Sequence, residues 1–308
     1  MLRFRALTAS WAAIHPQPKG VIFFIGGAFF GNFPTFFYRH LLQSLFDQGF
    51  TLVAFPFRFS FRHWSVAIGM ACDKAKIRQE LLESARQMSY DYSLYESDPN
   101  STAFNYLWLG HSLGCKYIAL LELLTDIEKQ SFRTGLNDCM GKLQAERLAN
   151  LLSEEDLKNV SLLNQPSILL DPVVSDLDEA IPIRSLRNLF SKVLRVQPSK
   201  QQTYCLIHNS RLFGLTAIVD FESSLAQTTV SALQQLLASQ AAHFQSLSIG
   251  HHLAALGFKG GRADIVNAVL HRLEEFQTRT ANRHQSARPE SADTQVGRRT
   301  GARTAAPN

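Results

Sequence analysis

The sequence predicts an α/β protein built on a mostly parallel sheet flanked by helices. Short apolar runs of strand length alternate with helical patterns from residue 20 to residue 276. These runs are apolar at consecutive positions, as in strands that are covered on both faces. No repeat or linker divides residues 1–276, so we expect a single domain there.

The elements of the first part of the chain have clear boundaries. Residues 21–25 are an apolar run between glycines, which favours a buried strand. Pro34 begins a helix whose apolar positions from residue 36 to residue 45 share one face, and Gly49 stands just past its end. The next strand is expected over residues 50–55.

An irregular connection and a helix separate this strand from the next one. Residues 61–69 are aromatic and only partly regular, and residues 73–88 show a helical apolar pattern. Pro99 marks a loop. The following apolar run ends at Leu109 and is expected to be a strand.

The second half of the chain has less regular patterns. We expect short polar helices over residues 126–160 and 173–213, as insertions or a partial cap. The expected strands are residues 167–170, 215–221 and 244–249, and the expected helices are residues 224–239 and 262–276.

The segment Gly110-His111-Ser112-Leu113-Gly114 lies between an expected strand and an expected helix. A serine at such a sharp turn adopts a strained backbone conformation, which exposes its hydroxyl. The amide of the next residue, Leu113, then points to where an oxyanion would form. The pattern predicts a nucleophile elbow with Ser112 as the nucleophile; the alternative is a tight turn whose glycines only serve packing.

A nucleophilic serine needs a base within hydrogen-bond reach. Reactive groups of an open parallel sheet collect at the carboxyl ends of its strands. His251 and His252 follow the last expected strand, and we favour His252 over His251 as the base. The alternative is a pair of surface or core-capping histidines.

The third member of a triad is an acid that orients the imidazole. Asp171 follows the strand 167–170 in a rigid Asp-Pro corner, and Glu222 follows the strand 215–221. Asp220 shares a face with Glu222, but lies before the strand end. The sequence leaves Asp171 and Glu222 open, and each could instead cap a helix or form a turn.

The glycine-rich segment at residues 26–31 follows the first strand and suits a second oxyanion donor, the amide of Ala28 or Phe29. It lacks the spacing of a phosphate-binding or dinucleotide-binding loop. No metal-ligand spacing stands out either, so we expect no cofactor and no metal.

Net charge and cysteine content indicate which partners and which cellular compartment to expect. Residues 277–308 contain six arginines and two acidic residues, so this segment contributes four of the five net positive charges of the chain. We expect it to be a disordered basic tail. The nearly neutral remainder does not predict nucleic-acid binding. No apolar run is long enough to span a membrane, and no signal peptide is evident. We expect a cytoplasmic protein, or one of an organelle such as the plastid, with all four cysteines reduced.

Several segments together resemble the α/β-hydrolase superfamily and, within it, a domain-of-unknown-function family (number 1350) of photosynthetic organisms. These segments are residues 23–31, Tyr38-Arg39, residues 53–56, residues 110–114 and residues 250–253. The resemblance spans residues 18–260 and implies the chain order serine, acid, histidine. In that family an asparagine stands at the position of His251 and a histidine at that of His252, which favours His252. The match is poorer at residues 220–222, so the acid stays open. The family has no established activity, so the resemblance implies fold rather than substrate.

Two functions follow as hypotheses. The first is a serine hydrolase that acts on an ester, thioester or similar acyl bond of a small, apolar substrate. The 22 phenylalanines are consistent with such a substrate, but a well-filled aromatic core is the better explanation for them. The second is a non-catalytic protein of the same fold that binds a lipid-like ligand or a protein partner. The sequence leaves the oligomeric state open.

Overall fold

The computed structural model describes most of the chain. The described residues are 2–96, 105–125, 130–153, 156, 160–162, 164–174, 196–210, 213–222, 224–239, 242–249, 251–257 and 263–287.

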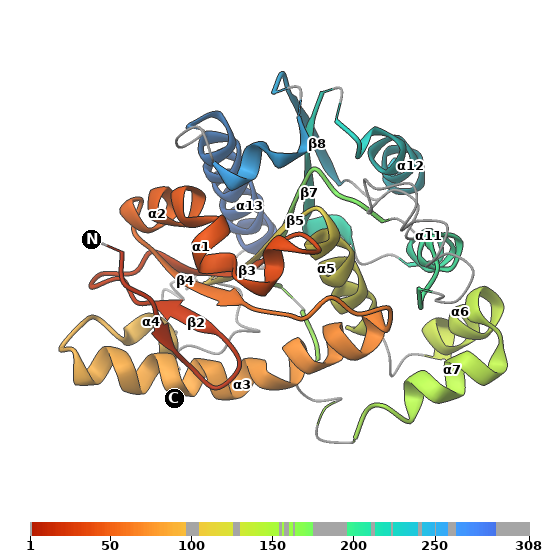
Figure 1. The fold of residues 1–308 in the computed structure, drawn as a ribbon, viewed down its shortest axis with the longest axis horizontal. Coiled ribbons are helices and arrows are strands. Elements are labelled where there is room, and N and C mark those ends of the chain that lie inside the picture. Colours follow the sequence, from red (N-terminus) through yellow and green to blue (C-terminus); the bar gives the residue numbers. More distant parts are fainter. Residues whose placement is uncertain are drawn as a thin grey trace, which may run out of the picture.

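In the described part of the chain, eight strands form one sheet in the order β1-β2-β4-β3-β5-β6-β7-β8 (Figure 1). The strands are β1 (Arg5–Ala6), β2 (Trp11–Ala13), β3 (Gly20–Ile25), β4 (Phe50–Phe55), β5 (Tyr106–His111), β6 (Ser167–Leu170), β7 (Thr216–Phe221) and β8 (His243–Leu247). β2 is antiparallel to β1 and β4, whereas all neighbours from β4 to β8 are parallel. The mostly parallel sheet expected from the sequence is therefore confirmed.

Helices cover both faces of this sheet (Figure 1). α2 (Arg39–Asp47) and α13 (Ala263–Ala287) pack on one face, and α3 (His63–Gln87), α5 (Leu113–Leu124) and α12 (Gln227–Leu237) pack on the other. The remaining elements are η1 (Phe30–Asn32), α1 (Pro34–Phe37), α4 (Ser93–Glu96), α6 (Gln130–Met140), α7 (Lys142–Ala149), α11 (Lys200–His208), η2 (Phe213–Leu215) and η3 (His252–Leu256). β3 to β6 are buried along their whole length, as their continuous apolar sequences require.

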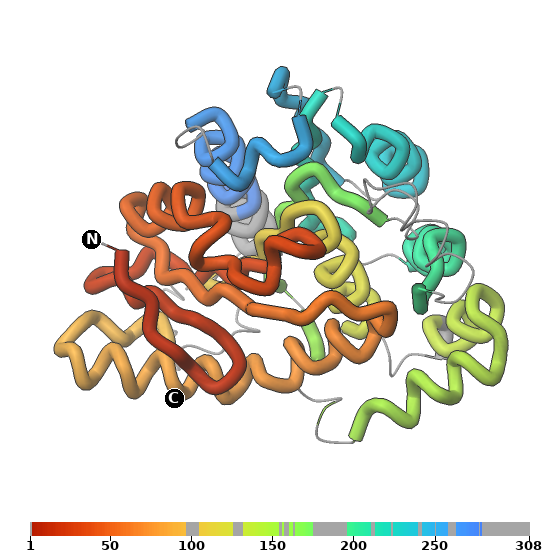
Figure 2. Tube along the Cα trace, viewed as in Figure 1, coloured from red at the N-terminus to blue at the C-terminus, as the bar shows by residue number. Residues whose placement is uncertain are grey.

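The expected insertion is helical and lies to one side. α6 and α7 pack together at the side of the molecule away from α1 and α2, with α11 next to α6 (Figure 2). The part of the second expected insertion that falls on residues 175–195 lies outside the described residues. No helix in the described part of the chain combines the length and the apolar character that a membrane span requires.

Two helix boundaries differ from those expected. The helix from Pro34 is divided at Tyr38 into α1 and α2, so that Phe36 is exposed rather than on the buried face. α3 begins at His63, ten residues before the expected start, because Trp64 and Ile68 already pack into the core at helical spacing.

The last helix is also longer than expected. α13 continues through Ala287, into the segment expected to be a disordered tail. Residues 288–308 lie outside the described residues.

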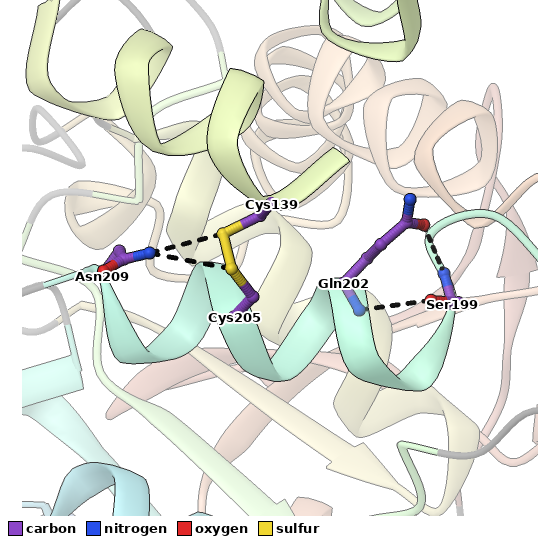
Figure 3. Close-up of a disulfide and its surroundings, with 5 residues drawn as sticks. All are labelled: Cys139, Ser199, Gln202, Cys205 and Asn209. Atoms are coloured by element: carbon purple, nitrogen blue, oxygen red, sulfur yellow. Dashed lines mark hydrogen bonds between the residues drawn. A yellow bond between two sulfur atoms is a disulfide. The ribbon is translucent and has the colours of Figure 1, made fainter. Parts of the chain in front are cut away.

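The expectation that all four cysteines are reduced is wrong. Cys139 of α6 and Cys205 of α11 form a disulfide, with their Cα atoms 5.6 Å apart (Figure 3). The two residues are 66 positions apart in the chain, so their proximity depends on how the inserted helices pack and leaves no local pattern in the sequence. Cys72 and Cys115 are free.

A buried carboxyl group on α5 makes the stability of the fold pH-dependent. Glu122 is buried and accepts a hydrogen bond from Ser167 Oγ (2.9 Å). Burial raises the pKa of Glu122 to about 8, although the Ser167 hydroxyl opposes part of that rise. Between the ordinary glutamate pKa and about 8, the folded state holds a proton that the unfolded state has lost.

We therefore expect the free energy of unfolding to fall as the pH rises from about 4.5 to about 8. Glu122→Gln carries no charge at any pH and should remove this decline, making the variant about 3 kcal/mol more stable than the parent at pH 8.5 and nearly equal at pH 5. Urea unfolding at both pH values measures the difference. Glu83→Gln, at an exposed position, is the control, and an unchanged pH slope in Glu122→Gln would refute the expectation.

Candidate active site

Ser112 occupies the turn between β5 and α5. Its backbone has φ 56° and ψ −122°, a strained conformation for a residue with a side chain. The turn is tight because Gly114 lies directly against β3, where an added Cβ would fall 2.1 Å from the carbonyl oxygen of Ile25. The turn projects the partly exposed Ser112 side chain from the carboxyl end of the sheet, as the elbow pattern predicts.

A histidine and an aspartate complete a hydrogen-bonded row with this serine. His252 Nε2 lies 2.7 Å from Ser112 Oγ, and His252 Nδ1 lies 2.5 Å from Asp171 Oδ2. A carboxylate only accepts, so Nδ1–H donates to Asp171, and Nε2 is left to accept from the serine hydroxyl. This is the arrangement in which an imidazole removes a proton from a nucleophile.

Asp171 is fully buried and held by two further donors. Its Oδ1 accepts from the backbone N–H of Phe221 (3.1 Å) and from Ser224 Oγ (2.8 Å). Its backbone φ is 45°, a left-handed conformation that aspartate tolerates better than most residues. The Asp-Pro corner after β6 therefore places the carboxylate between β7 and η3 with a fixed orientation.

The other candidates for acid and base lie elsewhere. Glu222 is exposed and accepts from Ser248 Oγ (2.8 Å), because it follows β7 on the side of the strand that faces β8. Asp220 accepts from Gln227 and Ser246. His251 is exposed in extended backbone next to η3. The structure thus brings Asp171, and not Glu222, to the histidine.

The two expected oxyanion donors flank Ser112. Leu113 is the first residue of α5, and Ala28 follows Gly27, where an added Cβ would lie 3.4 Å from Ser112 Oγ. The amide of Gly27 itself donates to the Tyr38 hydroxyl. Among the described residues, neither the Leu113 amide nor the Ala28 amide has a hydrogen-bond acceptor. Phe29 is one residue further along, and its exposed side chain stacks on Phe59.

Tyr38 and His111 connect the glycine loop to the catalytic histidine candidate. The Tyr38 hydroxyl accepts from Gly27 N–H (2.7 Å) and lies 2.8 Å from His111 Nδ1. His111 Nε2 lies 2.9 Å from the carbonyl oxygen of His252. Because the carbonyl only accepts, Nε2 carries the proton, and Nδ1 accepts from the Tyr38 hydroxyl. One continuous chain of hydrogen bonds therefore runs from Gly27 to His252.

Burial keeps the members of this chain neutral. Burial lowers the pKa of His111 well below its usual range, and the neighbouring His252 lowers it further. Burial also raises the pKa of Tyr38, although its hydrogen bond to Gly27 opposes the shift. The His111 ring packs 4.9 Å from the His252 ring between centroids. A neutral His111 does not repel the positive charge that His252 gains when it removes a proton.

The thiol nearest the serine in sequence is not a competing nucleophile. Cys115 is buried, and its Sγ donates to the carbonyl oxygen of Leu170 (3.4 Å). Burial raises the pKa of this thiol well above its ordinary value, and the charge of Asp171 adds to the shift. A thiol with so high a pKa has almost no reactive thiolate at neutral pH.

The sequence pattern indicates no role for three residues of the site. Ser224 has no local signal, because its contact with Asp171 spans 53 positions. His111 and Tyr38 stood within motifs that the resemblance singled out, but their bond spans 73 positions. The two motifs meet only in the folded chain, where Tyr38 stands between α1 and α2 and His111 ends β5.

Tyr38→Phe should weaken both stability and activity. The substitution leaves the buried Gly27 amide and His111 Nδ1 without their partner, which should cost about 2 kcal/mol of unfolding free energy. If the site hydrolyses esters, a looser glycine loop should also lower kcat about tenfold with little change in KM. Thermal unfolding and ester hydrolysis measure the two effects.

Tyr117→Phe is the matched control for this variant. Tyr117 is equally buried, but its hydroxyl has no protein partner in the described part of the chain. Its removal should be neutral or slightly stabilising. If Tyr38→Phe behaved like Tyr117→Phe in both measurements, the positioning role of Tyr38 would be refuted.

Comparisons with known proteins agree with this fold. Residues 3–137 match the model of a family described as protein of unknown function (DUF1350). No curated protein sequence matches the chain.

Among solved structures, the chain is similar to esterase B from Lactobacillus rhamnosis, with a TM-score of 0.55, 13% identity, and 93% of this chain and 88% of that chain covered. It is also similar to carboxyl esterase 2 from the fungus Tuber melanosporum (TM-score 0.51, 12% identity, 90% and 87% covered). A third similar structure is the Francisella virulence factor BioJ (TM-score 0.51, 15% identity, 91% and 84% covered). The chain has the α/β-hydrolase fold, and its residues 3–137 match the family that the sequence resembles.

Proposed function

We propose that the protein is a serine hydrolase that cleaves an ester, thioester or similar acyl bond of a small, apolar substrate. The observation that carries this proposal is the row Asp171–His252–Ser112, with contacts of 2.5 Å and 2.7 Å at the carboxyl ends of β5 and β6. For the fold alone, an unstrained turn would serve better than a strained serine in a row of this kind. The row therefore supports a chemical role. The esterases among the structurally similar proteins support the same class of reaction.

The reaction would proceed through an acyl-enzyme. Ser112 Oγ attacks the acyl carbon while its proton passes to His252 Nε2, and Asp171 stabilises the imidazolium that forms. The amides of Leu113 and Ala28 donate to the oxyanion. When the bond to the leaving group breaks, the leaving group takes the proton from His252.

A water molecule then releases the acyl group. The water gives a proton to His252 Nε2 as its oxygen attacks the acyl carbon, and Ser112 Oγ recovers that proton when the second tetrahedral intermediate collapses. The products are a carboxylic acid and an alcohol or thiol, and the enzyme regains its starting protonation. The hydrogen-bonded chain of neutral groups from Gly27 through Tyr38 and His111 would keep the glycine loop and His252 in fixed positions relative to each other during both steps.

Labelling with a fluorophosphonate tests this proposal. The parent protein should be labelled, and Ser112→Ala and His252→Ala should not be. His251→Ala is the matched control, because the neighbouring exposed imidazole has no place in the row and should leave labelling intact. A folded parent that resists the probe would refute the proposal and favour a non-catalytic protein that uses the same fold for binding.

A further inference from the structure

Exposed apolar side chains gather on the segments that carry the candidate active site. Nine large apolar side chains are exposed in the described part of the chain, and five of them belong to these segments. Phe29, exposed by 49%, lies in the glycine-rich segment after β3, and Phe33 and Phe36, exposed by 67% and 65%, follow that segment. Leu225 directly follows Ser224, and Leu253 directly follows His252. Exposed apolar groups concentrated in this way mark an interaction site rather than ordinary surface.

Two of the three phenylalanines contact neighbouring rings that are themselves packed against the core. Phe29 stacks on Phe59, with centroids 5.3 Å apart and an interplanar angle of 13°. Phe36 makes an edge contact with Phe37, which packs against the core below α1. Phe33 and Phe36 therefore belong to a segment that packs on the core, but most of their own apolar surface stays exposed to solvent.

The segments that carry these phenylalanines or contact them are basic. Asp47 is the one acidic residue between residues 20 and 72. Arg39, Arg58 and Arg62 are exposed on the segments that carry the phenylalanines or contact them, and none forms an ion pair within the described part of the chain. Glu222, beyond the end of β7, is the exposed acid closest in the chain to Leu225.

We propose that this aromatic and basic surface docks on an anionic lipid layer. Phenylalanines that stand outward can enter the boundary between headgroups and acyl chains, and arginines beside them attract the negative headgroups. The surface adjoins Ser112, because Gly27 packs against that serine only two residues before Phe29. If the proposed function holds, the substrate is then an acyl ester that the enzyme takes from the lipid layer itself.

Co-sedimentation with lipid vesicles tests the docking. The full-length protein should sediment with vesicles of phosphatidylcholine containing about 30% phosphatidylglycerol, and much less with phosphatidylcholine alone. The double substitution F33S/F36S should weaken binding to the mixed vesicles at least about tenfold. R39Q/R58Q should weaken it about fivefold and reduce its dependence on salt.

L143S/L151S is the matched control, because Leu143 and Leu151 are also well exposed (62% and 50%) and lie on and just after α7, on the side of the molecule away from α1 and α2 (Figure 1). This pair should leave vesicle binding unchanged. Circular dichroism and fluorophosphonate labelling of each variant show that its fold and serine are intact, since none of these side chains belongs to the triad.

Three results would overturn the proposal. They are a parent that stays in solution with the mixed vesicles, an L143S/L151S variant that loses as much binding as F33S/F36S, and a parent dimer that becomes monomeric in F33S/F36S. The last result, measured by light scattering, would mean that a second copy of the chain covers the surface. Vesicle binding without labelling would refute the proposed hydrolase and leave the docking surface standing, so the two proposals fail separately.

Discussion

Asp171→Asn should lower kcat/KM for a short p-nitrophenyl ester by about 10⁴-fold, while the protein stays folded. The carboxylate accepts the Nδ1 proton of His252, and that bond fixes which ring nitrogen is free to accept from Ser112. An amide at this position can turn its NH₂ group toward Nδ1 and stabilise the other tautomer, in which Nε2 carries the proton and cannot act as base.

Glu222→Gln is the matched comparison. The sequence alone left the choice between Asp171 and Glu222 open, and both substitutions replace a carboxylate with an amide of the same size. Glu222 is exposed and bonded to Ser248, so its substitution should change kcat/KM by less than about twofold. A large loss in Glu222→Gln together with a small one in Asp171→Asn would show that the acid is assigned wrongly.

Thermal unfolding separates a catalytic loss from a structural one. Asp171 also accepts from Phe221 N–H and Ser224 Oγ, so the asparagine variant should lose stability as well. Ser224→Ala removes one of these donors without touching His252. It should reproduce part of the stability loss but only a small part of the kinetic loss.

The parallel sheet could be predicted from sequence because its signal is local. The run at residues 50–55 is apolar throughout and matches the observed β4, and Ser167–Leu170 matches β6. The elbow is also local, because strand, turn, serine and helix are consecutive. His252 was favoured because the carboxyl ends of parallel strands meet at one edge of the sheet.

The choice of acid could not be made in this way. Asp171 and Glu222 both follow strands that end at the same edge, so topology places them equally well. What distinguishes them is the direction of each side chain where its strand ends. Asp171 has a left-handed backbone conformation and its side chain points toward η3, whereas the side chain of Glu222 lies on the β8 side. The local sequence predicts neither direction.

Contacts between insertions were beyond the reach of local patterns as well. The Cys139–Cys205 pair depends on how α6 packs on α11, and amphipathic helices can pack in many ways. The early start of α3 was concealed by Gly69, which interrupts the helical pattern but lies on the exposed side, where a glycine costs only about 1 kcal/mol. Tertiary packing, rather than propensity, decides that boundary.

Gly114→Ala should destabilise the protein by at least about 3 kcal/mol or prevent it from accumulating in soluble form. The added methyl would lie 2.1 Å from the carbonyl oxygen of Ile25 and 2.6 Å from that of Gly26, far inside van der Waals contact. Both atoms are backbone at the end of β3, which is paired on both sides by β4 and β5 and cannot move aside. Either α5 must lift from the sheet or the glycine loop must shift, and both movements would separate Ser112 from Ala28.

Gly69→Ala makes the same chemical change at a helical glycine with open space around it. Apart from the adjoining residues and the backbone of α3 itself, no heavy atom lies within 4 Å of the added Cβ, so the variant should gain up to about 1 kcal/mol from the higher helix propensity of alanine. Chemical denaturation of the two variants beside the parent measures the contrast. A Gly114→Ala protein as stable as the parent would contradict the close approach of α5 to β3. It would also contradict the geometry described for the turn at Ser112. A destabilised variant that still folds should also label more slowly with fluorophosphonate, because the methyl acts on the turn that holds both the proposed nucleophile and its proposed oxyanion donor.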